Sequence, residues 1–253
     1  MNLKKAKQEF LEFINQYDLT FPKMKRKLEH SFRVMENARN IAKSLNLNND
    51  EIEIATLIGL LHDIGHFEEI KEKDILKENT KIDHGDLGVE ILKNDNYIRK
   101  YIEENTYDNI IIKAIKNHNK FKIEDGLSNK ELLFSRITRD ADKLDIFYEG
   151  AEMFWTQAEQ VEEIDNSIIT DDVIKSFAKY IYLDRKQLKT KADSIIYFIS
   201  LIYDINFKYG FEILKKENYI SRILNKFTFK DKTTSKQMRH VLEIATQYIE
   251  NNL

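Results

Sequence analysis

The histidines of this chain are concentrated in its first half, and their neighbours suggest metal binding. Five of the six histidines lie between positions 30 and 118. His62 and Asp63 stand together at the end of an apolar stretch, within Leu-Leu-His-Asp-Ile-Gly-His at 60–66. An imidazole and a carboxylate at the inner end of a buried helix are costly unless they are paired or bind a metal ion. A divalent ion would satisfy both groups, since neutral imidazole is the commonest metal ligand in proteins.

Three other histidines are also expected to point inward. His30, His84 and His118 each share a helical face with apolar residues three, four or seven positions away. One such histidine alone is more often a hydrogen-bonded core residue than a ligand. Four of them beside a buried aspartate favour a metal centre instead. Histidine combined with aspartate favours zinc or a first-row transition metal over calcium.

Helices are the elements that would position these side chains. One proline and seven glycines are too few for the many turns of an all-β chain. The apolar residues of 50–64 cover nearly every side of a helix, so we expect this to be the central, buried helix, with Gly65 as its C-terminal stop. In this half the periodicity predicts helices over 22–45, 50–64, 83–93, 97–103, 108–118 and 128–148, with a loop over 119–126.

The second half of the chain is also predicted to be helical. Past Trp155 we expect a connection, followed by helices over 173–183, 192–209, 214–227 and 235–251. Thr190 with Asp193, and Thr234 with Gln237, are interpreted as capping boxes. Neither a repeat nor a linker separates the halves. We therefore expect one all-helical domain over 1–253, with a metal-binding core over 20–150 and a helical extension over 151–253.

Composition excludes several other classes of protein. Forty basic residues against 43 acidic ones give a formal charge of −3, so a nucleic acid polymer is not an expected partner. There is no cysteine, which excludes disulfides and thiolate ligands. The sequence shows neither a signal peptide nor a stretch long enough to span a membrane, and we expect a cytoplasmic location. The apolar C-terminal helices would serve a core or a homodimer interface equally well.

Asp142 is not singled out by periodicity. Its helical neighbours Ser135, Thr138 and Asp145 are polar, so the pattern alone favours a solvated surface acid.

The order of the chemically active residues resembles a known family. His30, then His62-Asp63, then Asp142 in Ala-Asp-Lys-Leu-Asp at 141–145 resembles the HD-domain superfamily of metal-dependent phosphohydrolases, an all-α helical bundle. The resemblance covers about 25–148 and implies that these four residues hold a metal ion. With His84 and His118 added, the order resembles the binuclear branch, which includes HD-GYP proteins and cyclic-nucleotide phosphodiesterases. On that likeness, Asp63 would bridge two ions.

The resemblance implies a reaction. We expect one or two divalent ions (Mn, Fe, Co, Ni, Zn or Mg) and a metal-bound hydroxide that attacks a phosphoester or nucleotide. Asp63 and His66 would be catalytic, although His66 would equally well cap the end of its helix. Arg139 and Lys143 would contact the substrate, with exposed salt bridges as the simpler alternative. His66 stands where HD-GYP proteins carry lysine, and no Gly-Tyr-Pro follows, so the likeness to that group stops at the metal ligands.

Two other functions stay open at this point. The same order of ligands resembles that of the di-iron oxygenases related to myo-inositol oxygenase, in which two irons activate dioxygen. Ligand types do not separate the two chemistries, because His and carboxylate sites accept iron, manganese, cobalt and zinc alike. The other alternative is a non-catalytic metal-binding signalling module.

Overall fold

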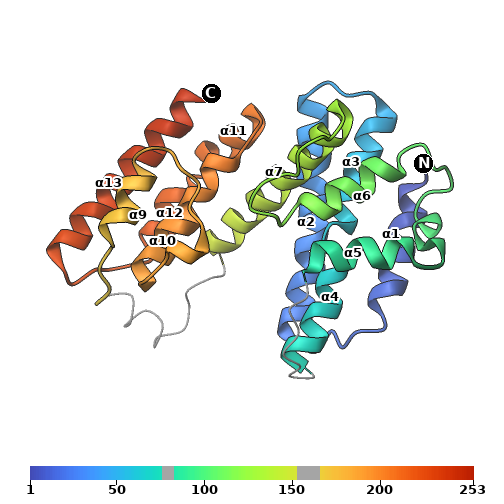
Figure 1. Cartoon of the computed structure of the whole chain (residues 1–253), viewed down its shortest axis with the longest axis horizontal. Coiled ribbons are helices and arrows are strands. Elements are labelled where there is room, and N and C mark those ends of the chain that lie inside the picture. The colour runs from blue at the N-terminus through green and yellow to red at the C-terminus, as the bar shows by residue number, and fades with distance from the viewer. Residues whose placement is uncertain (76–82, 153–165) are drawn as a thin grey trace. The chain divides into compact units, whose positions relative to one another are not determined.

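The structure is a computed structural model that describes residues 1–75, 83–152 and 166–253 (Figure 1). Every regular element within these residues is a helix, which confirms the all-α fold class. The chain divides into two compact units, Met1–Asp145 and Ile146–Leu253, and the division falls inside helix α7. That residues 1–253 form one domain, with a core over 20–150 and an extension over 151–253, stays a prediction. The connection expected past Trp155 falls partly on 153–165, outside the described residues.

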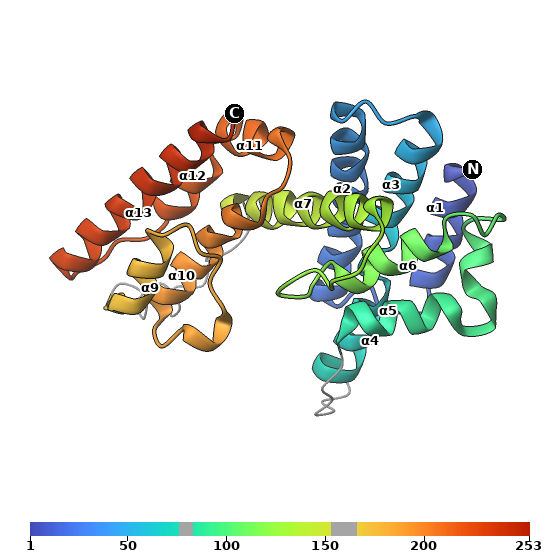
Figure 2. The same cartoon turned by 45° about the horizontal axis from the view of Figure 1, so that its top comes forward.

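The first unit contains the histidines of interest. Figures 1 and 2 show its two helices α2 and α3 running side by side. Between the regular helices lie a π-helical turn (Lys71–Ile75) and a 3-10 segment (Asn94–Lys100), the latter where a helix over 97–103 was expected. The α-helices are α1 (Leu3–Ile14), α2 (Pro22–Ser44), α3 (Asn49–Leu61), α4 (Ile64–Ile70), α5 (His84–Lys93), α6 (Asp108–Asn117) and α7 (Asn129–Glu152).

Helix α3 is the buried centre of this unit, as its apolar pattern predicts. It begins with a capping box between Asn48 and Glu51, and every residue from Ile54 to Leu61 is buried. The helix ends at Leu61 rather than at Ile64, and α4 begins after a break of two residues. Those two residues are His62 and Asp63, so the pair lies at the junction of two helices instead of on one helical face.

Two glycines allow the helices to approach closely. A Cβ atom on Gly59 would lie 2.9 Å from the Ala38 Cβ and from the Val34 carbonyl oxygen, where α3 crosses α2. Gly65 is not the helix stop that the sequence suggested, because it lies inside α4. A Cβ there would lie 2.3 Å from the His84 carbonyl oxygen. Glycine at 65 therefore lets the first turn of α5 approach the backbone of α4.

The ends of α5 and α7 follow local sequence signals. The Asp83 side chain caps α5 by accepting from the backbone N–H groups of Gly85 and Asp86. The Ser128 hydroxyl accepts from the Glu131 N–H, and the Glu131 carboxylate accepts from the Ser128 N–H. These two bonds form a capping box, which starts the helix that contains Asp142.

The second unit is also built from helices packed on one another, with α13 against α11 and α12. The capping box of Thr190 with Asp193 is confirmed. The one expected for Thr234 with Gln237 is wrong, because α13 starts earlier and is capped by Asp231. The helix predicted over 214–227 is broken at Asn218, which has a left-handed φ of 52°. The α-helices after α7 are α9 (Asp171–Phe177), α10 (Lys191–Ser200), α11 (Lys208–Lys216), α12 (Tyr219–Leu224) and α13 (Lys232–Asn251).

None of the helices in the described part combines the length and the apolar character needed to cross a membrane.

Candidate metal centre

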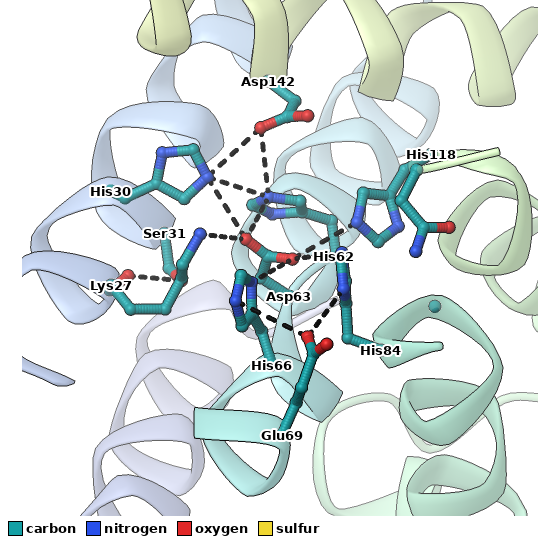
Figure 3. Close-up of polar contacts among 12 residues, drawn as sticks. Lys27, His30, Ser31, His62, Asp63, His66, Glu69, His84, His118 and Asp142 are labelled. Atoms are coloured by element: carbon teal, nitrogen blue, oxygen red, sulfur yellow. Dashed lines mark hydrogen bonds and ion pairs between the residues drawn. The ribbon is translucent and has the colours of Figure 1, made fainter. Parts of the chain in front are cut away.

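Asp63 lies at the centre of the polar cluster, and its two carboxylate oxygens face different partners (Figure 3). Its Oδ2 atom lies 3.2 Å from His62 Nε2 and 3.3 Å from His30 Nε2. Its Oδ1 atom lies 3.2 Å from His118 Nε2 and 3.5 Å from His84 Nε2. One carboxylate therefore joins two groups of imidazoles that come from four different parts of the chain.

Asp142 completes the group on the Oδ2 side. Its Oδ1 atom lies 3.2 Å from His30 Nε2 and 3.6 Å from His62 Nε2. We call His30, His62, Asp63 and Asp142 the first donor set, and Asp63, His84 and His118 the second donor set. The donor atoms of His30, His62 and Asp63, and those of the second set, are each close enough together to hold one metal ion.

The histidines of both sets are oriented in the same way. Each Nδ1 atom faces a carbonyl or carboxylate oxygen, which leaves Nε2 facing the centre. His62 Nδ1 donates to the Gly59 carbonyl (2.8 Å) and His118 Nδ1 to the Ile115 carbonyl (2.6 Å). The other two pair with acids: His30 Nδ1 with Asp145 Oδ2 (2.6 Å) and His84 Nδ1 with Glu69 Oε2 (2.9 Å). Such outer partners are typical of metal-binding histidines, because they fix the tautomer and the ring orientation.

The two imidazoles of the first donor set have raised pKa values. Burial alone would lower the pKa of His30, but the carboxylates of Asp142, Asp145 and Asp63 raise it to about 10. Burial would likewise lower the pKa of His62, but Asp63 and Asp142 raise it to about 9. The Nε2 atoms of the two rings nevertheless lie only 3.2 Å apart. Two imidazoles thus hold protons that the carboxylates attract, and a divalent cation would supply that positive charge without the repulsion.

The pKa values of the two carboxylates in this set are shifted in the opposite direction, downward. Burial would raise the pKa of Asp63, but the Lys27 ammonium and the His62 ring hold it well below its usual range. Burial is also outweighed at Asp142, where hydrogen bonds from His30 and His62 hold the pKa well below its usual range. Both acids are therefore ionised at neutral pH. Ionised carboxylates and imidazole nitrogens are the donor types that zinc and first-row transition metals bind, so the residues fit a divalent ion.

His66 lies beside the second donor set without joining it directly. Its ring stacks on the His84 ring, with centroids 4.4 Å apart. Its buried Nδ1 atom has no hydrogen-bond partner among the described residues and lies 3.6 Å from Asp63 Oδ1. Burial and the nearby Lys27 charge lower the pKa of His66 to about 4, so the ring is neutral. With Glu69, the two stacked histidines form a further group that could hold a metal ion.

The side chains of the cluster differ in their exposure to solvent. His30, His62, Asp63 and His118 are buried. The side chains that keep some exposure are Lys27 (15%), Asp142 (15%), His84 (21%) and His66 (27%). Solvent therefore reaches the cluster at these four residues.

The solvated position suggested for Asp142 by periodicity is wrong. The polar face of α7 is buried, because Ser135, Thr138 and Asp145 are all inaccessible to solvent. The two hydroxyl groups donate to backbone carbonyls one turn earlier in the same helix, which satisfies them without water. Asp145 accepts from His30 and Arg33. The face that looked exposed therefore presents Asp142 to the donor sets.

Arg139 and Lys143 are both buried, so the alternative of exposed salt bridges is wrong for them. Arg139 is 2% exposed, and its Nη1 atom donates to the carbonyls of Asn117 (2.8 Å) and Lys120 (2.6 Å). This guanidinium holds the chain that follows His118 and so supports the end of α6. A substrate contact by either residue stays a prediction.

Sequence reasoning missed several residues at the centre. Lys27 precedes His30 by one helical turn and donates to Asp63 Oδ2 at 2.8 Å. Glu69 pairs with His84. The spacing of three residues, from Lys27 to His30 and from His66 to Glu69, was the available signal. His240 lies outside the centre and is an exposed partner of Glu243.

The geometry defines an all-helical protein with two adjoining groups of His and Asp donors. The HD domain family model matches residues 28–146, a segment that contains every residue of both donor sets. That segment is an HD domain, and members of this family are mostly metal-dependent hydrolases. The resemblance noted from the sequence is thereby confirmed. No curated protein and no solved structure matches the chain.

Proposed function

We propose that this protein is a metal-dependent phosphohydrolase that acts on a small phosphoester or nucleotide. The main support is the division of Asp63, whose Oδ2 atom faces the first donor set and whose Oδ1 atom faces the second. A carboxylate shared in this way suits two adjacent divalent ions, which is the arrangement that phosphoryl transfer uses widely. His30, His62, Asp63 and Asp142 would hold one ion, and Asp63, His84 and His118 the other.

When bound, divalent ions lower the pKa of a water molecule and neutralise charge on phosphoryl oxygens. The protein contributes orientation. The Nδ1 bonds of the four histidines fix Nε2 as the donor atom, so little reorganisation is needed on binding. Burial of His30, His62 and His118 excludes water from the inner side of the centre. The neutral donors and the two carboxylates leave the loaded centre positive, which favours a phosphorylated substrate.

His66 is the residue that we assign to proton transfer. Its Nε2 atom lies 3.6 Å from Glu69 Oε2, so an N–H at this position would be turned toward a carboxylate. Nδ1 then presents a lone pair next to Asp63, where it is buried and unpaired within the described residues. From this position Nδ1 would accept a proton from the attacking water as the water oxygen bonds to phosphorus and the bond to the leaving group breaks.

The proposal is tested by turnover with defined metals. Purified protein is stripped with a chelator and loaded in parallel with Mn²⁺, Co²⁺, Ni²⁺, Zn²⁺, Mg²⁺ or Fe²⁺. Phosphate release is then measured from p-nitrophenyl phosphate and from a panel of nucleotides. Hydrolysis that needs added metal, is lost in His62→Gln and is retained in His240→Gln would support the proposal. The control residue is an exposed histidine outside both donor sets.

The same experiment also tests the two alternative functions, the di-iron oxygenase and the non-catalytic binding module. Dioxygen consumption by the Fe²⁺-loaded protein without phosphate release would overturn hydrolysis in favour of the oxygenase. Tight metal binding without turnover in either assay would instead identify a binding module. The first result requires dioxygen as co-substrate, so each iron-loaded assay is run with and without air.

A further inference from the structure

Lys27 places an ammonium group on an oxygen that a metal ion would use. Its Nζ atom lies 2.8 Å from Asp63 Oδ2, the oxygen of the first donor set (Figure 3). The residue lies one helical turn before His30 on α2, so both side chains share one face of that helix. The Lys27 side chain is mostly buried but keeps 15% of its surface exposed.

The contacts of this ammonium would change when metal binds. It pairs with Asp63, while the nearby acid Asp145 is paired with Arg33. A divalent ion in the first donor set would use the lone pairs of Asp63 Oδ2 that Lys27 now contacts. Two cations that share one oxygen repel each other, and the repulsion is strong where water is largely excluded. The Lys27 ammonium would then lose its contact with Asp63 and take another anionic partner.

We propose that Lys27 is the residue that binds the phosphoryl group of the substrate. Its ammonium pairs with Asp63 while metal is absent and with a phosphoryl oxygen once metal is present. This inference rests on the proposed function. It is separate from the predicted substrate contacts of Arg139 and Lys143. It follows from the position of Lys27, whose ammonium contacts the first donor set and whose side chain is partly exposed to solvent. Binding of metal and binding of phosphate are thereby coupled through one side chain.

The coupling predicts two opposite effects of one substitution. In Lys27→Met the side chain keeps its apolar stem but no longer competes for Asp63. Mn²⁺ should therefore bind more tightly, by about tenfold, because a neighbouring positive charge has been removed. Inorganic phosphate should bind the Mn²⁺-loaded variant about tenfold to a hundredfold more weakly, because a charge-assisted hydrogen bond is lost. Lys27→Arg keeps the charge and should retain phosphate binding.

The measurements are calorimetric titrations, first with Mn²⁺ and then with inorganic phosphate on the Mn²⁺-loaded protein. The matched control is Lys25→Met, an exposed lysine on the same helix that should leave both affinities unchanged. Weaker Mn²⁺ binding in Lys27→Met, or unchanged phosphate binding, would overturn the proposal and leave Lys27 as a structural partner of Asp63. If Lys27→Met does not fold, Lys27→Gln is titrated in its place and judged by the same two results.

These titrations are independent of the turnover assay. A wild-type protein that hydrolyses phosphoesters, combined with a Lys27→Met variant that binds phosphate normally, would refute the role of Lys27 alone. A wild-type protein without hydrolysis that still shows both effects of the substitution would retain the anion site and refute the proposed function.

Discussion

The substitution Asp145→Asn tests whether metal binding at the first donor set depends on the orientation of the His30 ring as well as on its presence. The Asp145 carboxylate accepts from His30 Nδ1 (2.6 Å), from Arg33 Nε (2.5 Å) and from Arg33 Nη2 (3.0 Å). The isosteric amide keeps one oxygen and introduces an NH₂ group opposite groups that are themselves donors. If the amide nitrogen faces His30, the ring must give up its Nδ1 proton, and Nε2 becomes protonated instead of ligating.

The magnitudes follow from these contacts. A hydrogen bond to a charged group contributes about 1.5–3 kcal/mol. Because the Arg33 side chain is partly exposed, water compensates for much of its share, and we count one such bond as lost. The free energy of unfolding should fall by about 2 kcal/mol. Loss of the outer partner of a metal-binding histidine lowers metal affinity about 10–100-fold. We expect a decrease of this size in the affinity of the first donor set for Mn²⁺.

The assay is calorimetric titration of Mn²⁺ into chelator-treated protein, with urea unfolding in parallel. Arg33→Gln is the matched control, because it removes the guanidinium but leaves the carboxylate on His30. It should reduce stability while keeping the Mn²⁺ affinity near that of the wild type. The reasoning is refuted if folded Asp145→Asn binds Mn²⁺ as the wild type does. It is also refuted if Arg33→Gln weakens Mn²⁺ binding as much as Asp145→Asn does.

Three further predictions concern the second donor set and the effect of pH. Glu69→Gln should weaken one of two Mn²⁺-binding steps about tenfold or more in a calorimetric titration, because Glu69 orients His84. Gly65→Ala puts a Cβ 2.3 Å from the His84 carbonyl oxygen. It should lower the free energy of unfolding by about 1–3 kcal/mol in urea and abolish the same Mn²⁺ step. In the metal-free protein, pKa values raised to about 10 at His30 and about 9 at His62 stabilise the fold fully below their unfolded value, near pH 6.5. This stability is lost progressively as pH rises from about 6.5 to 10, so the melting temperature in EDTA should fall across that whole interval.

Each of these experiments has a control. Glu68→Gln removes a carboxylate that contacts Tyr17 and Lys71 rather than His84, so both Mn²⁺ steps should persist. A Cβ on Gly88 would meet two side-chain atoms at 3.3 Å and the Gly65 backbone nitrogen at 3.5 Å, so Gly88→Ala should disturb the fold less than Gly65→Ala. For the pH series, the metal-loaded protein should show no comparable fall, because its imidazoles are already neutral. A melting temperature that rises in EDTA toward pH 10 contradicts the assignment of protons to His30 and His62.

Much of the donor geometry could be predicted because helical spacing is a local property. His30 and His118 have apolar neighbours three and four residues away, and both are buried as that spacing indicates. The same reasoning failed for Asp142, because it equates a polar face with an exposed one. Ser135 and Thr138 satisfy their hydroxyl groups on their own helix, so this face can be buried without other partners. The periodicity of polar and apolar residues does not show that these hydroxyl groups are bonded within their own helix.

Other differences depend on contacts between distant parts of the chain. The bond from Lys27 to Asp63 joins positions 36 residues apart. The spacing from Lys27 to His30 puts both on one helical face, but nothing local indicates which acid the ammonium contacts. Gly65 was interpreted as a helix stop, whereas its actual use is the approach of His84 and the start of α5. The break at Asn218 arises from a left-handed backbone conformation that asparagine tolerates, although the surrounding apolar pattern continues without interruption.

The shared carboxylate of Asp63 also determines how the protein would respond to scarcity of metal. Because each oxygen serves a different donor set, occupancy of one set changes the free energy of filling the other, and the two affinities are thermodynamically linked. The second set includes His84, which keeps contact with solvent, whereas His30 and His62 are enclosed. A limiting amount of chelator would therefore empty the second set first, and a half-loaded species would accumulate before the bare protein.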